Sequence, residues 1–182
     1  MGPVNAAFSL GRLLERSGEL RGGLNLGIAG SFDPQVLPLY QPVVVQEEIW
    51  PEFGVRTAEG VDPERLKHGQ GSLAGETVRD RVALHPKARL AEIGVSPFPP
   101  WPEARSRTVA GASGDPEQAE RYRRRYAADA ENMEGFALAW PCLKSGVPFA
   151  EVRCMSNLVG SDLKGDWDIR GALDRLRDVA ST

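Results

Sequence analysis

The stretch that decides the fold is Gly23-Leu24-Asn25-Leu26-Gly27-Ile28-Ala29-Gly30-Ser31. Its apolar residues predict a short buried strand, and its closely spaced glycines predict a turn at the end of that strand. Before it, residues 4–16 carry apolar side chains at the three-and-four spacing of a helix. After it, residues 42–50 are rich in valine, which favours a second interior strand.

The C-terminal half continues the alternation of helices and strands. Asp115-Pro116-Glu117 is typical of a helix start, because an N-cap acid precedes a proline in the first turn. Periodicity then predicts a strand over 128–133, a helix over 134–144 that is kinked or ends near Pro141, and a strand over 148–155. Asp168 predicts the cap of a last helix whose inner face carries Ile169, Leu173 and Leu176. The alternation indicates an α/β layer structure with a largely parallel sheet.

The middle of the chain is poorly patterned. Residues 52–107 show only a short helical patch around 75–84. Four prolines between residues 97 and 102 exclude a helix or a central strand from that stretch.

Length and composition limit the classes of function. A chain of 182 residues fits one domain over 1–182, since domains usually hold about 100 to 200 residues. Lys and Arg number 22 against 25 Asp and Glu, a net charge of −3, so we expect neither nucleic acid nor a membrane surface as partner. No apolar run approaches the roughly 18 residues of a membrane span. With no signal-peptide pattern at the start, we expect a cytoplasmic protein.

The two cysteines, Cys142 and Cys154, form no CxxC pair and no ladder of metal ligands. We therefore expect no disulfide framework, no metal site and no cofactor. His68 and His85 lie in the poorly patterned middle and receive no catalytic role. The arginines between residues 121 and 125 fit a solvated helix end better than a phosphate site.

Three stretches carry candidate chemistry, and the first is Gly27-Ile28-Ala29-Gly30-Ser31. Its glycines would let backbone amides approach a ligand closely, as phosphate and ribose sites require. A purely structural turn explains the same residues.

The second stretch is Ala130-Glu131-Asn132-Met133-Glu134-Gly135. At a strand-to-helix corner, the Glu134 carboxylate can accept hydrogen bonds from both hydroxyls of a ribose, and Met133 can lie against the apolar face of the sugar. An acid in a first helical turn, favoured by the helix dipole, is an equal alternative for Glu134.

The third stretch, residues 150–157, ends in Ser156 and Asn157. An amide at a strand end can both donate and accept, which suits a purine edge that presents an oxo group and an NH. Asparagine is also a routine turn residue. Trp167 could close over a purine as an aromatic lid, or could pack as a hydrophobic staple of the last helix.

Taken in order, four motifs resemble those of the nucleoside phosphorylase and nucleosidase superfamily. They are Gly2-Pro3-Val4-Asn5-Ala6-Ala7, Asn25-Leu26-Gly27-Ile28-Ala29-Gly30, Glu131-Asn132-Met133-Glu134 and Val152-Arg153-Cys154-Met155-Ser156-Asn157. Within the superfamily, four stretches are similar to the futalosine hydrolase family: Pro3-Val4-Asn5-Ala6-Ala7, Glu131-Asn132-Met133-Glu134-Gly135, Ser156-Asn157-Leu158-Val159-Gly160 and the Trp167-Asp168-Ile169 helix start. The resemblance implies a three-layer α/β/α fold with a central mixed sheet. It also implies removal of hypoxanthine from futalosine in bacterial menaquinone biosynthesis.

The resemblance also implies a role for each residue of the site. It puts Glu134 on the ribose hydroxyls, with Met133 and Asn132 beside the sugar. It puts Ala29 and Gly30 at a turn lining the reaction centre. Asn157 would meet the base and be oriented by Ser156 and Arg153. Related methylthioadenosine nucleosidases carry an aspartate at the base position, so the asparagine favours a 6-oxopurine.

The choice between hydrolysis and phosphorolysis depends on the nucleophile. Phosphorylases of this superfamily hold phosphate with an arginine and a hydroxyl at the glycine-rich stretch, because an anion needs charge-assisted donors. Here Ile28 takes the place of the hydroxyl, which favours water, although Ser31 lies nearby. A purine nucleoside phosphorylase and a methylthioadenosine/S-adenosylhomocysteine nucleosidase are the enzyme alternatives.

The family pattern begins with a strand and a water-activating glutamate that have no counterpart here, because this sequence starts at the helix motif. Glu47 or Glu48 could replace that glutamate, or could serve as charges on a sheet edge. We expect a sheet that lacks its N-terminal strands, with an exposed edge near the first helix. The resemblance implies a homo-oligomer, and a partner chain would cover this edge. An inactive nucleoside-binding or oligomer-building subunit is the alternative to an enzyme.

Overall fold

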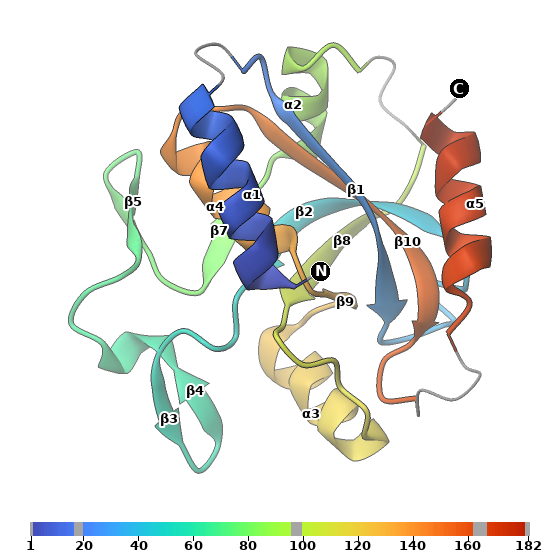
Figure 1. The fold of residues 1–182 in the computed structure, drawn as a ribbon. Helices are drawn as coiled ribbons and strands as arrows, with labels where there is room; N and C mark the ends of the chain where they lie inside the picture. Colours follow the sequence, from blue (N-terminus) through green and yellow to red (C-terminus); the bar gives the residue numbers. More distant parts are fainter. Residues whose placement is uncertain (1, 17–19, 96–99, 162–166, 181–182) are drawn as a thin grey trace.

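The computed structural model describes residues 2–16, 20–95, 100–161 and 167–180. Its centre is a six-stranded mixed sheet in the order β10-β1-β9-β8-β2-β7 (Figure 1). The bounds of these strands are β1 Gly23–Ser31, β2 Pro42–Ile49, β7 Arg81–Ala83, β8 Glu103–Thr108, β9 Ala130–Asn132 and β10 Phe149–Leu158. The prediction of an α/β fold with a mixed central sheet is confirmed.

The sheet closes on itself. Strand β1 pairs in parallel with β10 along its whole length, and β8 pairs in parallel with both β2 and β9. The antiparallel pairings β1–β9 and β2–β7 extend the sheet. Residues Val152 to Cys154 of β10 also pair with the first residues of β2. Strands β10, β1, β9, β8 and β2 therefore form a closed ring, to which β7 is added on β2.

Helices cover both faces of the sheet. Helices α1 (Pro3–Arg16) and α4 (Gly135–Lys144) pack against each other on one face. Helices α2 (Pro86–Glu92) and α5 (Ile169–Ala180) contact β10 on the other face (Figure 1). The side chains of β10 alternate accordingly, since Phe149 packs with Phe136 of α4 while Val152 and Cys154 pack with α5. The three-layer arrangement follows from this alternation.

The remaining elements are short and peripheral, except for helix α3. They are the hairpin of β3 (Val55–Thr57) and β4 (Gly60–Asp62), a 3₁₀ turn at Pro63–Arg65, the hairpin of β5 (Gly71–Leu73) and β6 (Glu76–Val78), and α3 (Pro116–Tyr126). Asp115 caps α3 as predicted, because its carboxylate accepts a hydrogen bond from the backbone N–H of Gln118 at 2.7 Å.

The predicted helical patch over 75–84 is wrong, because these residues form β6 and β7. The buried side chains there are Val78, Val82 and Leu84. The spacing of four between Val78 and Val82 fits one face of a helix and equally one face of a strand. A turn with positive φ at Ala74 and Gly75 leads into β6 and favours the strand pairing.

Strand β8, which is a member of the ring between β9 and β2, was not predicted from the sequence. Its last three residues, Ser106, Arg107 and Thr108, are buried although all are polar. A strand that buries polar side chains shows no apolar alternation, so periodicity does not reveal it. The proline-rich stretch ends just before it, and residues 97–99 of that stretch lie outside the described residues.

The expected unpaired sheet edge is present in β1. In the described part of the chain, residues 23–29 pair only with β10, whereas Gly30 and Ser31 pair with β9 as well. Leu24 and Leu26 on this edge are partly exposed. What covers the edge stays a prediction. No helix of the described residues has the length and apolar character to span a membrane.

Candidate active site

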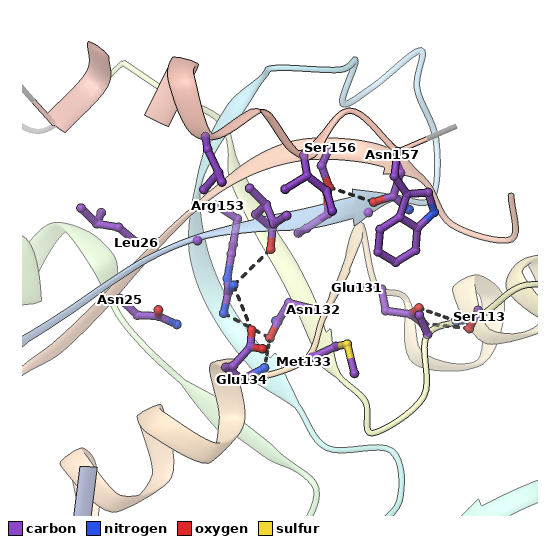
Figure 2. Close-up of a pocket in the computed structure, with 18 of the residues that line it drawn as sticks. Asn25, Leu26, Ser113, Glu131, Asn132, Met133, Glu134, Arg153, Ser156 and Asn157 are labelled. Atoms are coloured by element: carbon purple, nitrogen blue, oxygen red, sulfur yellow. Dashed lines mark hydrogen bonds and ion pairs between the residues drawn. The ribbon is translucent and has the colours of Figure 1, made fainter. Parts of the chain in front are cut away.

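A cavity of about 410 Å³ lies where β1, β9 and β10 meet the starts of α4 and α5. All nine predicted site residues line it: Ala29, Gly30, Asn132, Met133, Glu134, Arg153, Ser156, Asn157 and Trp167. In the view of Figure 2, Asn25 and Asn157 lie towards opposite ends of the pocket, with Arg153, Asn132 and Glu134 between them. The structure thus brings together motifs that are far apart in the sequence.

The glycine-rich stretch is strand rather than turn, which corrects the sequence interpretation. Residues 27–31 form the second half of β1. A Cβ at Gly27 would collide with the guanidinium of Arg153, and a Cβ at Gly30 would lie 2.9 Å from Nδ2 of Asn157. These glycines therefore make room for two side chains of the neighbouring β10, which reach across β1 into the cavity.

Glu134 stands at the corner between β9 and α4. Its side chain makes no capping hydrogen bond. Asn132 serves as the cap instead, since its Oδ1 accepts the backbone N–H groups of Glu134 at 2.8 Å and Gly135 at 2.7 Å. The carboxylate of Glu134 accepts the Gly2 N–H at 3.1 Å and lies 3.5 Å from Nη1 of Arg153. Glu134 therefore lies at the N-terminal end of α4, where the helix dipole favours an acid, and its carboxylate is held by Gly2 and Arg153; its role as a sugar-binding residue stays a prediction.

Arg153 lies under the cavity and is 2% exposed. Its Nε donates to Glu151 at 2.6 Å, its Nη1 to the carbonyl of Ile28 at 3.1 Å, and its Nη2 to Oδ1 of Asn132 at 3.2 Å. One guanidinium thus ties β10, β1 and the corner after β9 together. Its fork of fixed donors suits it to hold several acceptors in one geometry.

A β-bulge presents Ser156 and Asn157 to the cavity. The register of β10 against β1 runs from Met155 opposite Ala29 to Asn157 opposite Gly30, so Ser156 is the extra residue. The Ser156 hydroxyl lies 2.9 Å from Oδ1 of Asn157 and 3.2 Å from the carbonyl of Ala29. The bulge therefore places a hydroxyl against the Asn157 amide and fixes how that amide is turned.

Trp167 lines the cavity beside the start of α5, and its buried Nε1 has no hydrogen-bond partner among the described residues. Asp168 next to it accepts hydrogen bonds from Gly171 N at 2.8 Å, which confirms the predicted helix cap, and from the Tyr40 hydroxyl at 2.6 Å. The Asp168 N–H donates to the carbonyl of Ser156. These bonds join the Trp167 segment to the bulge.

The prediction for the inner face of α5 was partly wrong. Leu176 is buried together with Ala172, but Ile169 and Leu173 are 43% and 46% exposed and line the cavity. Both side chains therefore belong to the pocket wall rather than to the core. Other lining residues that sequence reasoning did not single out are Leu26, Ala112, Ser113, Glu131 and Leu138.

Ser113 and Glu131 form a second polar pair in the wall. Both oxygens of the Glu131 carboxylate accept hydrogen bonds from Ser113, at 2.8 Å from its N–H and 2.9 Å from its hydroxyl. Arg107 lies 3.5 Å from the same carboxylate and stacks on Tyr122, with 4.1 Å to the ring centroid. Glu131 precedes the Asn132-Met133-Glu134 motif directly, and that adjacency is the one sequence signal that pointed to it.

The interpretation of Glu48 as a charge on a sheet edge is wrong, because Glu48 is 0% exposed. Glu47 fits an edge charge, since it is partly exposed and pairs with Arg81 at 3.2 Å. The Glu48 carboxyl lies 2.7 Å from Nδ2 of Asn132 and 2.6 Å from the Thr108 hydroxyl. Burial and the nearby Glu151 hold the pKa of Glu48 well above its ordinary value.

Neither histidine lines the cavity. Within the described ranges, no group of three or more His, Cys, Asp and Glu side chains could hold a metal ion. Cys142 and Cys154 are free thiols, both buried. That the protein uses no metal and no cofactor stays a prediction.

Comparison with known proteins places this geometry in context. The sequence model of the Phosphorylase superfamily matches residues 1–182. The chain is 34% identical over 179 residues to a futalosine hydrolase of Thermus thermophilus, an alignment that spans 97% of this chain and 74% of the relative. It is 28% identical to a 5'-methylthioadenosine/S-adenosylhomocysteine nucleosidase of Tolumonas auensis, spanning 76% of this chain and 57% of the relative.

The fold is shared with solved structures. A futalosine hydrolase mutant of Helicobacter pylori superposes with a TM-score of 0.69 at 17% identity, covering 99% of this chain and 73% of the other. At that identity the likeness shows the fold alone. The match of the superfamily model to the whole chain and the identity to the Thermus relative show that this chain belongs to the phosphorylase superfamily.

Proposed function

We propose that this chain is a nucleosidase that hydrolyses the N-glycosidic bond of a 6-oxopurine nucleoside. The substrate we favour is futalosine, which would give hypoxanthine and dehypoxanthinyl futalosine in menaquinone biosynthesis. The observation that carries the proposal is that the amide of Asn157, set by the bulge and Ser156, faces the same cavity as the carboxylate of Glu134. The similarity to the Thermus futalosine hydrolase supports it.

The sugar would be bound at the corner after β9. The Glu134 carboxylate would accept the ribose hydroxyls, and Met133 would lie against the sugar with Asn132 beside it. As the bond to the base breaks, positive charge develops on the ribose, and a fixed carboxylate stabilises that charge. Arg153 and the Gly2 N–H hold Glu134 from two sides, so the carboxylate is oriented before substrate arrives.

The base would be bound at the bulge. The Asn157 amide presents one donor and one acceptor, which match the NH and the oxo group of hypoxanthine. An adenine would present an amino group and an unprotonated ring nitrogen, which an amide turned the other way would match, so the preference for a 6-oxopurine depends on how Ser156 turns the Asn157 amide. Trp167 would stack on the purine from its place in the wall. The methylthioadenosine nucleosidase alternative rests on the Tolumonas relative.

Water is the nucleophile we favour over phosphate. Arg153 is the one arginine or lysine among the described residues that line the cavity, and its donors are taken by protein oxygens. Ile28 offers no hydroxyl. Ser31 does not line the cavity, and its hydroxyl oxygen accepts the Asp33 N–H at 3.2 Å. A phosphate would therefore lack charge-assisted donors.

The test is to incubate the purified protein with futalosine, inosine and methylthioadenosine, each with and without phosphate, and to follow hypoxanthine or adenine by chromatography. We expect phosphate-independent release of hypoxanthine, fastest from futalosine. Dependence on phosphate with formation of ribose 1-phosphate would indicate a phosphorylase instead. Release of adenine as the fastest reaction would contradict the assignment of Asn157. Release of no base, with hypoxanthine bound, would indicate an inactive binding subunit.

We also propose that the chain is one domain that works as a homo-oligomer in the cytoplasm, without nucleic acid or membrane as partner. The partly exposed Leu24 and Leu26 on the unpaired edge of β1 support association through that side. Light scattering on the purified protein should give a mass above that of one chain. A monomer over the micromolar range would contradict the oligomer.

A further inference from the structure

A cluster of ionisable groups runs from the cavity wall into the protein interior, and two of its members, Glu48 and Glu151, play no direct part in the proposed reaction. Glu48 and Glu151 are both 0% exposed, and Arg153 between β10 and β1 is 2% exposed. Glu134, on the cavity side of Arg153, completes the cluster. Two fully buried carboxyl groups and the partly exposed carboxylate of Glu134 therefore lie around a single guanidinium.

The two buried carboxyl groups converge on the first residue of α4. A Cβ at Gly135 would lie 2.5 Å from the carboxyl carbon of Glu48 and 2.7 Å from Oε1 of Glu151, so these two atoms are at most about 5.2 Å apart. Two carboxylates this close in a dry interior repel each other strongly. Such pairs keep a proton on one of their members.

The partners of each group show which one keeps the proton. Glu151 accepts the Nε–H of Arg153 at 2.6 Å and is thus matched with a positive charge. Glu48 contacts neutral side chains, with Nδ2 of Asn132 at 2.7 Å and the Thr108 hydroxyl at 2.6 Å. One oxygen of Glu48 accepts from the Asn132 amide, and the other accepts from the Thr108 hydroxyl. Neither of these partners brings a positive charge to Glu48, whereas Glu151 bonds directly to the guanidinium of Arg153.

We propose that Glu48 is a protonated, uncharged positioning residue for the ribose-binding corner. This inference rests on the proposed function, in which Glu134 binds the sugar. As a neutral acid, Glu48 fixes the Asn132 amide, which caps the corner at Glu134 and Gly135. It also leaves Arg153 to Glu151 and Glu134. An ionised Glu48 would compete for Arg153 and withdraw it from Glu134.

The direction of the pKa agrees with this geometry. Burial first, and then the charge of Glu151, raise the pKa of Glu48 well above its ordinary value, whereas Thr108, Arg153 and Asn132 lower it by less. The titratable or charged groups around Glu48 are the other members of the cluster: Glu151 and Arg153 from β10, and Glu134 from the corner before α4.

The first test compares the stability of the wild type and Glu48→Gln against pH, because glutamine keeps one donor and one acceptor at this position. In the native wild type Glu48 keeps a proton that it loses in the unfolded chain above about pH 4.3. The free energy of unfolding of the wild type therefore falls as the pH rises from there towards the raised pKa of Glu48 in the native state. We expect Glu48→Gln to have the higher Tm at pH 8, with the difference shrinking towards pH 4. Glu47→Gln, on the same strand, should follow the wild type. A difference that is absent at pH 8, or of opposite sign, overturns the proposal.

A second measurement needs no variant and no activity. Infrared spectra of the wild type, with isotope-labelled glutamate, should show the carbonyl band of a protonated carboxylic acid at pH 7. Absence of that band overturns the proposal even if Glu48→Gln does not fold.

The third test is the pH profile of kcat/KM with futalosine. We expect the rate of the wild type to fall at alkaline pH, and we expect Glu48→Gln to stay within about threefold of the wild type at pH 6 and to lose that fall. A profile identical to that of the wild type, or a loss of activity at every pH in a folded variant, contradicts the positioning role. If neither protein cleaves any nucleoside, the proposed function fails, while the stability and infrared results still decide the state of Glu48.

Discussion

At the scale of single residues, the Glu134 carboxylate is held by two donors of the protein itself, the Gly2 N–H and the Arg153 guanidinium. We predict that Glu134→Gln lowers kcat by about 100- to 1,000-fold, because a neutral amide cannot stabilise the charge that develops on the ribose. Tm should change little, since the side chain keeps its shape and part of its surface is exposed. Steady-state kinetics and thermal unfolding test both parts.

The matched control is Glu47→Gln, which removes a carboxylate from the protein surface. That variant should keep the kcat of the wild type. A large loss of stability in Glu134→Gln without a loss of activity would mean that Glu134 is structural.

A second prediction at this scale concerns the base. Asn157→Asp replaces an amide donor by an acceptor, and the Ser156 hydroxyl can still donate to the new carboxylate. The ratio of adenine released from methylthioadenosine to hypoxanthine released from futalosine should rise by at least about tenfold, since a mispaired buried group costs about 1–3 kcal/mol. Parallel assays on both substrates measure the ratio, and an unchanged ratio would show that Asn157 does not read the base.

The sequence could predict the residues that face the cavity better than those behind it. Glu134 and Asn157 lie in motifs whose chemistry is legible without a structure. Glu48 and Glu151 lie within strands, and a glutamate in a strand is normally predicted to be a solvent-exposed charge. Their burial depends on Arg153 of β10, which is distant in sequence from Glu48, and on the missing Cβ of Gly135 in α4, which is distant from Glu48 and outside the strand of Glu151.

At the scale of elements, the start of α4 leaves no room for a side chain at Gly135. Gly135→Ala would bring a methyl group against the carboxyl groups of Glu48 and Glu151, which the hydrogen-bond network holds in place. We predict a loss of about 1–3 kcal/mol in the free energy of unfolding, as for overpacked cores. Urea denaturation measures this loss.

The same substitution in another helix should have the opposite sign. Gly11 lies within α1, and a Cβ there would meet nothing within 4 Å. Gly11→Ala should therefore stabilise the protein by about 0.5–1 kcal/mol through helix propensity. If both variants changed stability equally, the tight contact at Gly135 would not be the cause.

Elements with a clear period or cap were predictable: α1, β2, α3, β10 and α5 appear where the sequence places them. Strand β8 was not, because its buried side chains are polar and bond to groups on other strands, as Thr108 does to Glu48. The glycines of β1 read as a turn because the side chains that fill the space beside them belong to β10. Both errors come from partners that are distant in sequence.

At the scale of the whole molecule, the closed ring and the two helical layers keep both cysteines from water. Burial raises the pKa of Cys142 and of Cys154 to about 11. We predict that neither thiol reacts with iodoacetamide at pH 8 in the native protein, because the thiolate is scarce and inaccessible. Both should react in denaturant, and mass spectrometry counts the adducts. Rapid modification of the native protein would show that the layers open readily.

The ring of strands also has a consequence for how this site can change over generations. Its polar network takes one or more side chains from each of four strands: Glu48 from β2, Ser106 and Thr108 from β8, Asn132 from β9, and Arg153 from β10. Substitutions within such a network are strongly epistatic, because the removal of one side chain leaves its hydrogen-bond partners unsatisfied and so changes the effect of substituting them. The wall behind the proposed sugar site is therefore expected to evolve in concerted steps, whereas Ile169 and Leu173 at the pocket wall can vary singly. New substrate preferences would arise there first.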